Sequence, residues 1–500
     1  MLPPIPKLED HSISCRNGFL PDHLPVRRLS DRYYEPWEDL VDNLQALILT
    51  KRIRAAVNLL PLLSVSRLRS EPELQRAYSI LGFICHSYIW GGDRPAQRLP
   101  ACISVPFLRV SESLEIVPVA SYAGVTLWNY RTLFGSQEID NLEDLATLQT
   151  FTGSLDESWF YLVSVAIEAR GAPVVPRMLE AIAAAREGDA DTVFEFLNSF
   201  AQILEELTAL LVRMYESCDP HVFYFKIRPF LAGSKNMAEA GLPQGVWYED
   251  EDGKGSWRQY SGGSNAQSSL IQAFDLILGI EHQPTGVKRL TGDDSHKHGT
   301  TPPQKHNFIE EMREYMPGPH RRFLERLASV ANIRPFVDAH RDNQDLCDAF
   351  DSCLAMLRGF RDKHIQIVSR YIIIQAKNAK KLSTEAAKIT RNVLSSPATT
   401  QKANLASTKA TKKGLTGTGG TALIPFLKQA RDETGEPAMS PIAKRLLVHS
   451  PGRKSPVVYD NDTGAAELDA AFSNPDVPAP MVGLAGYWFS SNEFGGLCSY

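Results

Sequence analysis

The sequence predicts an all-α protein, and three observations carry that prediction. Apolar residues recur at gaps of three and four over several long stretches, the period of a helix with one buried side. The alternation of apolar and polar residues that marks a half-buried strand is scarce throughout. The chain has 500 residues, 43% hydrophobic and 22% charged, which is the composition of an ordinary globular protein.

The clearest helical pattern covers residues 343–376, with Asn343 as the expected N-cap. His364 lies inside its apolar stripe, four residues from Phe360 and four from Val368. An imidazole that points into an apolar seam either forms a hydrogen bond within the core or binds a ligand held there. Composition alone favours the core interpretation.

The N-terminal part of the chain predicts a small helical domain at residues 1–148. Two long helical patterns run from residue 36 to 90. Residues 91–111 resemble a loop with irregular extended pieces, because glycine and proline interrupt them. Residues 113–134 and 141–148 again have apolar spacing compatible with helix.

A larger helical domain is expected over residues 149–431. Its helical patterns cover 156–170, 175–186, 189–218 and 308–326, as well as the long helix described above. Residues 219–233 are aromatic and are interrupted by Pro229, which disfavours helical geometry at Arg228.

Three further segments lack helical periodicity. Residues 283–305 are polar and predict an inserted loop. Residues 377–416 are rich in Lys, Ser, Thr and Ala, as in a mobile connector. Residues 432–500 are rich in proline and weakly patterned, so we expect a mostly disordered tail there.

Charge and cysteine content exclude several classes of protein. A net charge of −5 gives no electrostatic reason to expect a nucleic-acid partner. The seven cysteines are scattered without CxxC spacing, which indicates reduced intracellular thiols and no zinc site or disulfide framework. The N-terminus lacks a signal pattern and no apolar run is long enough for a membrane span. We therefore expect a cytoplasmic protein without a membrane partner.

The string SGGSNAQSS at residues 261–269 is the most unusual in the chain. It comes close to the GxSxG elbow that would make Ser264 a hydrolase nucleophile, but neither the strand nor the parallel sheet of that motif is visible. A second interpretation is a turn in which Gly262 and Gly263 supply positive φ and Ser264 caps the next helix. In a third, the backbone amides of the turn face a bound ligand.

Two other motifs are weak. GTGGT at residues 417–421 lacks the preceding strand and the GK[ST] ending of a phosphate-binding loop. His296 and His298, beside Asp293 and Asp294, could bind a metal weakly, but no further ligands are spaced nearby, which favours a solvated loop.

Two groups of side chains could line one pocket. Phe160 and Ser164 are one helical turn apart, so that an aromatic ring and a hydroxyl share a face. Phe223 and Tyr224 precede Arg228, which offers aromatic walls and a guanidinium suited to a carboxylate. Taken singly, each is more often core packing or a surface charge.

Six strings together, in order along the chain, resemble the indoleamine 2,3-dioxygenase family from residue 15 to 431. They are YIWGGDRPAQRLPACISVPFLRVS, FYLVSVAIEARGAPVVP, GGSNAQSSLIQAFDLILGI, MREYMPGPHRRFLERL, LRGFRDKHIQIVSRYIIIQA and GTGGTALIPFLK. The resemblance implies a monomeric, fungal-type haem enzyme with a small domain packed on a larger haem-binding domain. It implies that the enzyme opens the indole ring of L-tryptophan with O2 to give N-formylkynurenine, the first step of the kynurenine route toward NAD. An electron donor would keep the iron ferrous.

The same resemblance implies a haem-binding set. His364 corresponds to the proximal ligand of the iron of haem b, whereas Cys353 on the same stripe has no counterpart as a ligand. Arg361 and Asp275 correspond to the pair beside a haem propionate. Gly263 belongs to the backbone turn beside the oxygen site.

The resemblance also implies which residues form the substrate pocket. Phe160 would pack on the indole, Ser164 would orient the substrate ammonium and oxygen without acting as an obligatory base, and Arg228 would bind the carboxylate. The remaining positions implied are Tyr122, Val125, Phe223, Tyr224, Ser264, Asn265 and Thr418, the last on a loop that closes over the substrate. Tyr224, Val125 and Asn265 depart from residues common in the family and put substrate affinity in doubt. The alternative is a low-turnover haem-binding relative that acts as a sensor or signalling scaffold.

Overall fold

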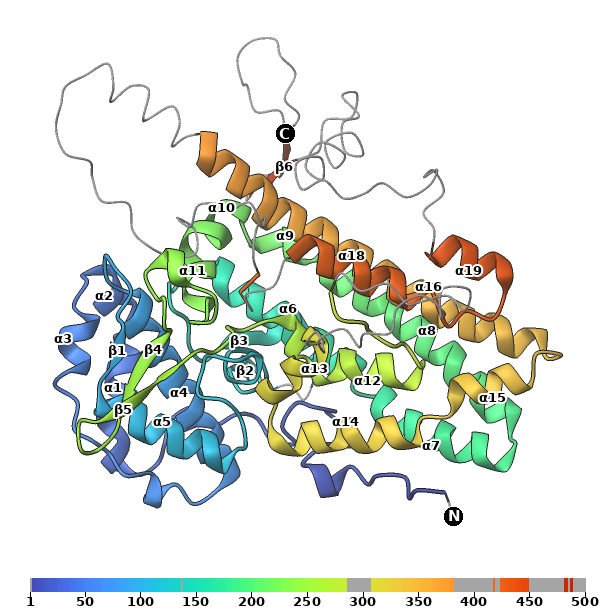
Figure 1. The fold of residues 1–500 in the computed structure, drawn as a ribbon, viewed down its shortest axis with the longest axis horizontal. Helices are drawn as coiled ribbons and strands as arrows, with labels where there is room; N and C mark the ends of the chain where they lie inside the picture. Colours follow the sequence, from blue (N-terminus) through green and yellow to red (C-terminus); the bar gives the residue numbers. More distant parts are fainter. Residues whose placement is uncertain are drawn as a thin grey trace, which may run out of the picture. The chain divides into compact units, whose positions relative to one another are not determined.

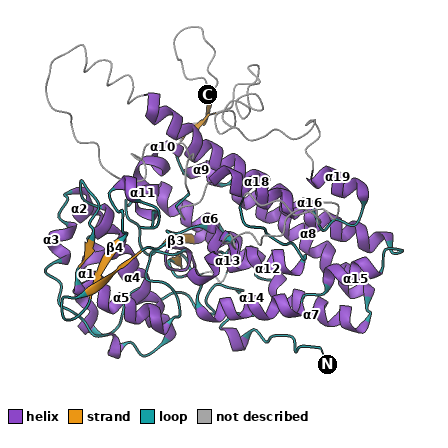
Figure 2. Ribbon diagram, viewed as in Figure 1, coloured by secondary structure: helices purple, strands orange, loops and turns teal. Residues whose placement is uncertain are grey.

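The computed structural model describes residues 2–135, 138–285, 307–381, 417–418, 423–448, 481–483 and 486–488. Within these ranges helices dominate and the strands form only small sheets (Figure 2), so the all-α class is confirmed. The chain forms two compact units, one of residues 1–409 and 415–451 and the other of residues 410–414 and 452–500. In the second unit, β6 (Met481–Gly483) and β7 (Gly486–Trp488) pair antiparallel.

The first unit is built around α16 (Gln344–Val368), which packs along α8 (Ala190–Val212) (Figure 1). The side chain of Asn343 caps α16 by accepting a hydrogen bond from the Leu346 N–H at 3.1 Å. After Val368 the backbone passes through a π-helical turn, η10 (Ser369–Ile373), and stays helical to residue 381. The helix predicted over 343–376 is thus confirmed, and it continues into the first residues of the predicted connector.

Other large helices of this unit pack on α8 or on one another. On α8 pack α6 (Leu155–Gly171) and α7 (Val174–Glu187), while α12 (Ser269–Ile277) packs on α14 (Gly318–Val330). The chain between α14 and α16 forms α15 (Ile333–Ala339), which contacts both α7 and α16. The predicted helices in this half are confirmed with two exceptions. The pattern 189–218 divides into α8 and α9 (Met214–Ser217). The pattern 308–326 divides into α13 (Phe308–Glu311), the 3-10 turn η9 (Met312–Tyr315) and α14.

The N-terminal helices differ from the prediction. The first long pattern divides into α1 (Glu35–Asp42), α2 (Leu44–Leu49) and α3 (Ile53–Val57), while the second is α4 (Glu71–Trp90). The predicted loop 91–111 contains a helix, α5 (Ala101–Ser113), which packs on α4. Its residues Ile103, Phe107 and Val110 are fully buried at helical spacing, so packing overrides the interruption by Pro106.

Short strands replace two of the predicted helical patterns. Within 113–134 lie the π-helical turn η4 (Ala123–Leu127) and β2 (Tyr130–Thr132), and β2 pairs antiparallel with β3 (Leu145–Thr147) from 141–148. A second sheet has the order β1-β4-β5, formed by β1 (Arg98–Leu99), β4 (Val246–Glu249) and β5 (Gly255–Arg258). In it β1 runs parallel to β4, and β5 runs antiparallel to β4.

Residues 432–448 do not belong to a disordered tail. They contain the end of α18 (Leu423–Thr434), which lies along α16, and α19 (Pro441–Val448) (Figure 1). Asp351 of α16 accepts hydrogen bonds from the N–H groups of Met439 at 2.7 Å and Ser440 at 2.9 Å. These contacts across the fold order a segment whose own composition predicts none.

Several predictions fall outside the described residues. They include nearly all of the inserted loop 283–305, with His296, His298, Asp293 and Asp294, and most of the connector 377–416. The predicted domain boundary at residue 148 lies inside the first unit, shortly before α6, and stays a prediction. Among the helices that the structure describes, none is both long and apolar enough to cross a lipid bilayer.

Candidate functional site

One cavity of the first unit gathers most of the predicted site residues. It is bounded by α6, the segment 223–231, the turn at 262–266, α16 and α18. The predicted residues that line it are Tyr122, Val125, Phe160, Ser164, Phe223, Arg228, Gly263, Ser264, Asn265, His364 and Thr418. Tyr224, Asp275 and Arg361 do not line this cavity.

His364 enters the cavity from α16, where Ile367 and Val368 are lining neighbours one turn away. Burial lowers the pKa of His364 to about 4, and the charge of Arg361 acts in the same direction. The imidazole is therefore neutral at pH 7 and keeps one nitrogen lone pair, the form that binds metal ions. Cys353 is no competitor, because its thiol donates to the Leu197 carbonyl of α8 at 3.1 Å and lies away from the cavity.

Asp275 and Arg361 form the centre of a buried charge cluster. Arg361 Nη2 lies 2.6 and 2.7 Å from the two carboxylate oxygens of Asp275. His282 donates from one ring nitrogen to Asp275 at 3.0 Å and from the other to Glu433 of α18 at 2.7 Å. Arg361 also donates to the hydroxyl of Thr434. The cluster thus ties α12, α16 and α18 together.

The pKa values in this cluster follow from its pairing. Burial by itself would raise the pKa of Asp275, but Arg361 and His282 together lower it. Burial likewise opposes the charged form of His282, yet the carboxylates of Asp275 and Glu433 raise its pKa above the ordinary value. The cluster therefore holds a carboxylate and an imidazolium away from water, each compensated by its neighbours.

Aromatic rings and a guanidinium line the cavity together with His364. The rings of Phe160 and Phe223 pack with centroids 4.9 Å apart. Arg228 is 2% exposed, and burial lowers its pKa to about 10, so the guanidinium stays charged at neutral pH. Tyr224, predicted to contact substrate, instead packs with its ring 5.5 Å from the Arg228 guanidinium carbon and supports that side chain.

The expected disruption at Arg228 is wrong. Its φ of −51° and ψ of −37° are helical, and it begins α11 (Arg228–Leu231). Pro229 stands in the first turn, where a missing N–H removes no helical hydrogen bond. The π-helical turn η6 (Phe223–Ile227) precedes it, which places Phe223 and Arg228 on the same cavity.

The glycine turn approaches other backbone very closely. A Cβ on Gly262 would lie 2.0 Å from the Leu231 carbonyl oxygen, and one on Gly263 would lie 2.9 Å from that of Ala120. Neither glycine has positive φ, so the predicted reason for them is wrong and close approach replaces it. Thr418 closes over this turn, because its hydroxyl donates to the Gly263 carbonyl at 2.7 Å and its carbonyl accepts the Gly262 N–H at 3.1 Å.

Ser264 has a local structural role. Its hydroxyl accepts the Ala266 N–H at 3.3 Å and caps the short turn η8 (Asn265–Gln267), while Ser268 caps α12. The strand nearest before it, β5, pairs antiparallel with its neighbour. The surroundings of Ser264 therefore lack the parallel sheet that a nucleophile elbow requires.

Sequence reasoning missed three titratable residues of this region: Glu168, His282 and Glu433. Glu168 on α6 is 1% exposed and accepts the hydroxyls of Tyr122 at 2.9 Å and Ser268 at 2.7 Å. A signal was available for it, because it is a lone acidic residue four positions after Ser164 in an apolar run. His282 and Glu433 are 151 residues apart, so their pairing could not be inferred from spacing.

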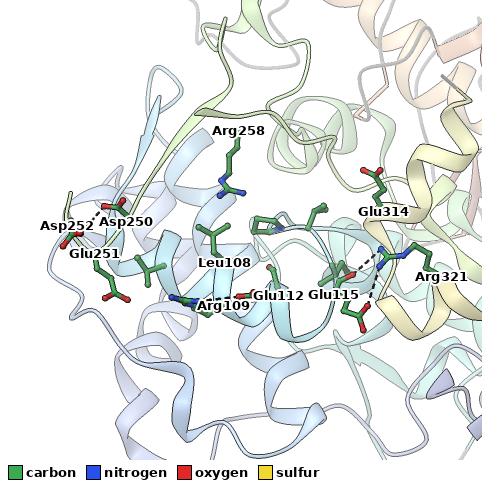
Figure 3. A pocket seen from close by; sticks show the side chains of 15 residues that line it. Leu108, Arg109, Glu112, Glu115, Asp250, Glu251, Asp252, Arg258, Glu314 and Arg321 are labelled. Atoms are coloured by element: carbon green, nitrogen blue, oxygen red, sulfur yellow. Dashed lines mark hydrogen bonds and ion pairs between the residues drawn. The ribbon is translucent and has the colours of Figure 1, made fainter. Parts of the chain in front are cut away.

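A second cleft, of about 790 Å³, is lined by charged residues and contains none of the predicted site residues (Figure 3). Asp250, Glu251 and Asp252 line one end of it and Arg321 the other. Two of its arginines pair with lining carboxylates, Arg109 with Glu112 at 3.7 Å and Arg321 with Glu115 at 3.8 Å. The cavity at His364 is thus the better candidate for a functional site.

In the ranges that the structure describes, no three His, Cys, Asp or Glu side chains gather as a metal-binding group. The donor set at the candidate site is therefore one neutral imidazole in a largely apolar cavity. A helical protein with one neutral imidazole in such a cavity has a single side chain of the kind that binds metals in a prosthetic group.

Comparison with known proteins agrees with this class. The family model for indoleamine 2,3-dioxygenase matches residues 7–437. The chain is 42% identical over 442 residues to indoleamine 2,3-dioxygenase of Saccharomyces cerevisiae, an alignment that covers 86% of this chain and 93% of the yeast protein. It is 41% identical over 442 residues to an indoleamine 2,3-dioxygenase of Aspergillus nanangensis, covering 87% and 98% of the two chains.

A further relative is named for another indole. The chain is 36% identical over 429 residues to 6-hydroxytryptophan 2,3-dioxygenase of Fusarium equiseti, covering 86% and 97% of the two chains. The chain belongs to the indoleamine 2,3-dioxygenase family, whose members are haem-dependent dioxygenases, so the family prediction is confirmed.

Proposed function

We propose that this protein opens the indole ring of L-tryptophan with O2, giving N-formylkynurenine, on haem b bound through His364. The observation that carries the proposal is the meeting of a neutral imidazole, an aromatic pair and a buried guanidinium in one cavity. The relatives are named as dioxygenases, which disfavours the alternative of a sensor or signalling scaffold.

The residues present fit a haem group. The neutral nitrogen of His364 would hold the iron, and the apolar side chains of Leu211, Ile372 and Leu427 line the same cavity. Asp275 and Arg361, in the cluster one helical turn from His364, would stand near a propionate. When bound, haem supplies ferrous iron that activates O2, and an electron donor would keep the iron reduced.

The chain's own residues would hold the substrate. The Arg228 guanidinium would pair with the tryptophan carboxylate, a strong interaction because both charges are withdrawn from water. Phe160 and Phe223 would pack against the indole and fix the plane of its ring. Tyr122 and Val125 would line the inner end, and the Ser164 hydroxyl would orient the ammonium.

The turn at Gly263 and Thr418 would exclude water from the cavity. Two hydrogen bonds join Thr418 to this turn, and Thr418 and the turn both line the cavity beside Ser264 and Asn265. Holding the indole double bond in place and keeping water out accounts for the protein's part in the reaction. No acid–base pair is required, since both atoms of O2 enter the product.

The proposal also covers the domain organisation, the oligomeric state and the cellular location of the protein. The part before residue 148 would act as a small domain that covers the distal side, contributing Tyr122 and Val125 to the site. The protein would be a cytoplasmic monomer that feeds the kynurenine route toward NAD.

One experiment tests the core of the proposal. Purified protein supplied with hemin should show a haem absorbance band that shifts with dithionite and again with L-tryptophan. Under O2 with a reductant it should form N-formylkynurenine from micromolar tryptophan. The assignment would be contradicted if the protein stayed colourless after reconstitution. It would also be contradicted if the His364→Ala variant bound haem as well as the wild type does.

A further inference from the structure

His86 is a buried histidine of α4 to which the proposed function gives no role. It is 2% exposed and does not line the cavity at His364. Both of its ring nitrogens have backbone partners: Nδ1 lies 2.6 Å from the Phe230 carbonyl oxygen, and Nε2 lies 3.0 Å from the Ala120 nitrogen. An aliphatic side chain would fill the same space without burying polar atoms, so packing alone does not explain a histidine here.

The two partners fix the proton on the His86 ring. A carbonyl oxygen can only accept, so Nδ1 carries the proton and donates it to Phe230. A backbone N–H can only donate, so Nε2 keeps its lone pair and accepts from Ala120. Burial lowers the pKa of His86 to about 4, against the effect of the Phe230 bond, and the ring is therefore neutral at pH 7. Because the imidazole is rigid, it holds these two backbone groups at a set separation.

The Phe230 side of this link leads to Arg228. Both residues belong to α11, a single helical turn of four residues. The last carbonyls of a helix have no partner within it, and His86 supplies one for Phe230. Trp90, one turn after His86 on α4, donates from its ring nitrogen to the Ala232 carbonyl at 2.9 Å. Two side chains of α4 thus hold the end of the turn that carries the buried guanidinium.

The Ala120 side leads to the inner end of the cavity. Ala120 comes two residues before Tyr122, which lines the cavity. The Ala120 carbonyl oxygen lies against the glycine turn, 2.9 Å from where a Cβ on Gly263 would stand. The backbone N–H of Tyr122 donates to the Gln267 side chain at 2.9 Å. His86 therefore fixes the start of a stretch of backbone that packs directly on the site.

We propose that His86 is a positioning residue whose ring sets the separation between the helical turn that carries Arg228 and the segment that carries Tyr122. The inference rests on the proposed function, in which Arg228 binds the substrate carboxylate and Tyr122 lines the inner wall. Because His86 does not line the cavity, it acts through the backbone. Its bond to Phe230 governs where the guanidinium lies, and its bond to Ala120 governs where the inner wall lies.

Two conservative variants separate these bonds. An asparagine amide nitrogen can take the place of Nδ1, so His86→Asn keeps the bond to Phe230 and loses the bond to Ala120. The longer glutamine places its amide oxygen near the position of Nε2, so His86→Gln keeps the bond to Ala120 and loses the bond to Phe230. The haem-reconstituted wild type and variants are titrated with L-tryptophan and with tryptamine, which lacks the carboxylate, and binding is followed by the haem absorbance.

The two variants should differ in which ligand they affect. His86→Gln should weaken L-tryptophan binding about three- to tenfold, the effect of one lost hydrogen bond, and leave tryptamine binding unchanged. His86→Asn should weaken both ligands by similar factors, because the inner wall contacts the indole that they share. Trp90→Phe releases Ala232 beside the same turn, so it should resemble His86→Gln and carries the test if His86→Gln does not fold.

His320→Gln is the matched control. His320 is also buried, with its Nδ1 3.3 Å from the Ser269 hydroxyl, but it does not line the cavity and contacts neither α11 nor Ala120 through a hydrogen bond. Its replacement should lower the free energy of unfolding and leave the ratio of tryptophan to tryptamine affinity at the wild-type value. A purely structural role for His86 predicts the same unchanged ratio for His86→Gln.

The outcomes separate the inference from the proposed function. If the wild type binds tryptophan but His86→Gln weakens both ligands equally, or neither ligand, His86 does not position Arg228 and the inference is wrong while the proposed function stands. A loss confined to tryptophan in His86→Asn would also contradict it. If the wild type binds haem but not tryptophan, the proposed function fails and the inference fails with it. A loss confined to tryptophan in His86→Gln, absent from His86→Asn and from His320→Gln, supports the inference.

Discussion

Replacement of His282 by Gln should destabilise the protein most strongly at acidic pH. The His282 side chain is 6% exposed and lies between two buried carboxylates, 3.0 Å from Asp275 and 2.7 Å from Glu433. Glutamine has similar reach but no charge, so one carboxylate loses its charged partner. Removing one member of a buried ion pair costs about 3–5 kcal/mol. Arg361 still compensates Asp275, so we expect the lower end, about 3 kcal/mol.

The sign of the pH dependence follows from the raised pKa of His282. A cationic group whose pKa is higher in the folded state contributes full stability below its unfolded pKa of about 6.5. That contribution is lost as the pH rises through the folded-state pKa, above 6.5. The stability gap between wild type and His282→Gln should therefore be widest below about pH 6.5 and should narrow in alkaline solution.

Urea unfolding of both proteins at about pH 6 and about pH 9 measures this gap. The matched control is His320→Gln, since His320 is equally buried but burial lowers its pKa to about 3. In the folded protein His320 is neutral at both pH values, but in the unfolded chain it is largely protonated at about pH 6. Its replacement should therefore cost less at about pH 6 than at about pH 9, the opposite direction to His282→Gln. If the difference in unfolding free energy between wild type and His282→Gln were constant, or larger in alkaline solution, His282 would not be a charged partner of Asp275 and Glu433.

Three other predictions test the site. Arg228→Leu should weaken tryptophan binding by about 2–5 kcal/mol while sparing tryptamine, which lacks the carboxylate; equal losses for both in equilibrium titrations would contradict the pairing. Gly263→Ala should lower kcat, because the new Cβ would lie 2.9 Å from the Ala120 carbonyl oxygen and displace the turn. Its control, Gly359→Ala on α16, meets open space, so it should raise stability by about 1 kcal/mol in urea unfolding and leave kcat unchanged. His364→Ala should lose haem on gel filtration and regain colour with added imidazole, and colour retained without imidazole would rule out the axial role.

Local periodicity predicted the helices whose buried faces are continuous. The long helix that carries His364 and the helix that carries Phe160 and Ser164 were predicted within a few residues of their ends. The periodicity did not predict helices in which proline or turn residues interrupt the apolar pattern. An example is α5 around Pro106, whose helical geometry depends on packing against α4. The periodicity failed again at residues 432–448, which are ordered by contacts with a helix far away in sequence.

The site shows the same division. The family motifs identified the residue numbers of the predicted site, and in the structure most of these residues line one cavity. Of the predicted substrate-binding residues, Tyr224 does not line the cavity but packs against Arg228, although it neighbours Phe223 in the chain. Which side of a π-helical turn a residue occupies is decided by tertiary packing, so neighbours in sequence can have opposite roles.

The sequence by itself determined the family, the helical class and the position of His364 on a buried stripe, because these depend on residue identity and local spacing. Only the tertiary structure decided which charges are paired. Glu168 with Tyr122, and His282 between Asp275 and Glu433, join segments 46 and 151 residues apart at the widest. Hydrogen bonds act over about 3 Å, and no one-dimensional pattern reports which distant segments the fold brings that close.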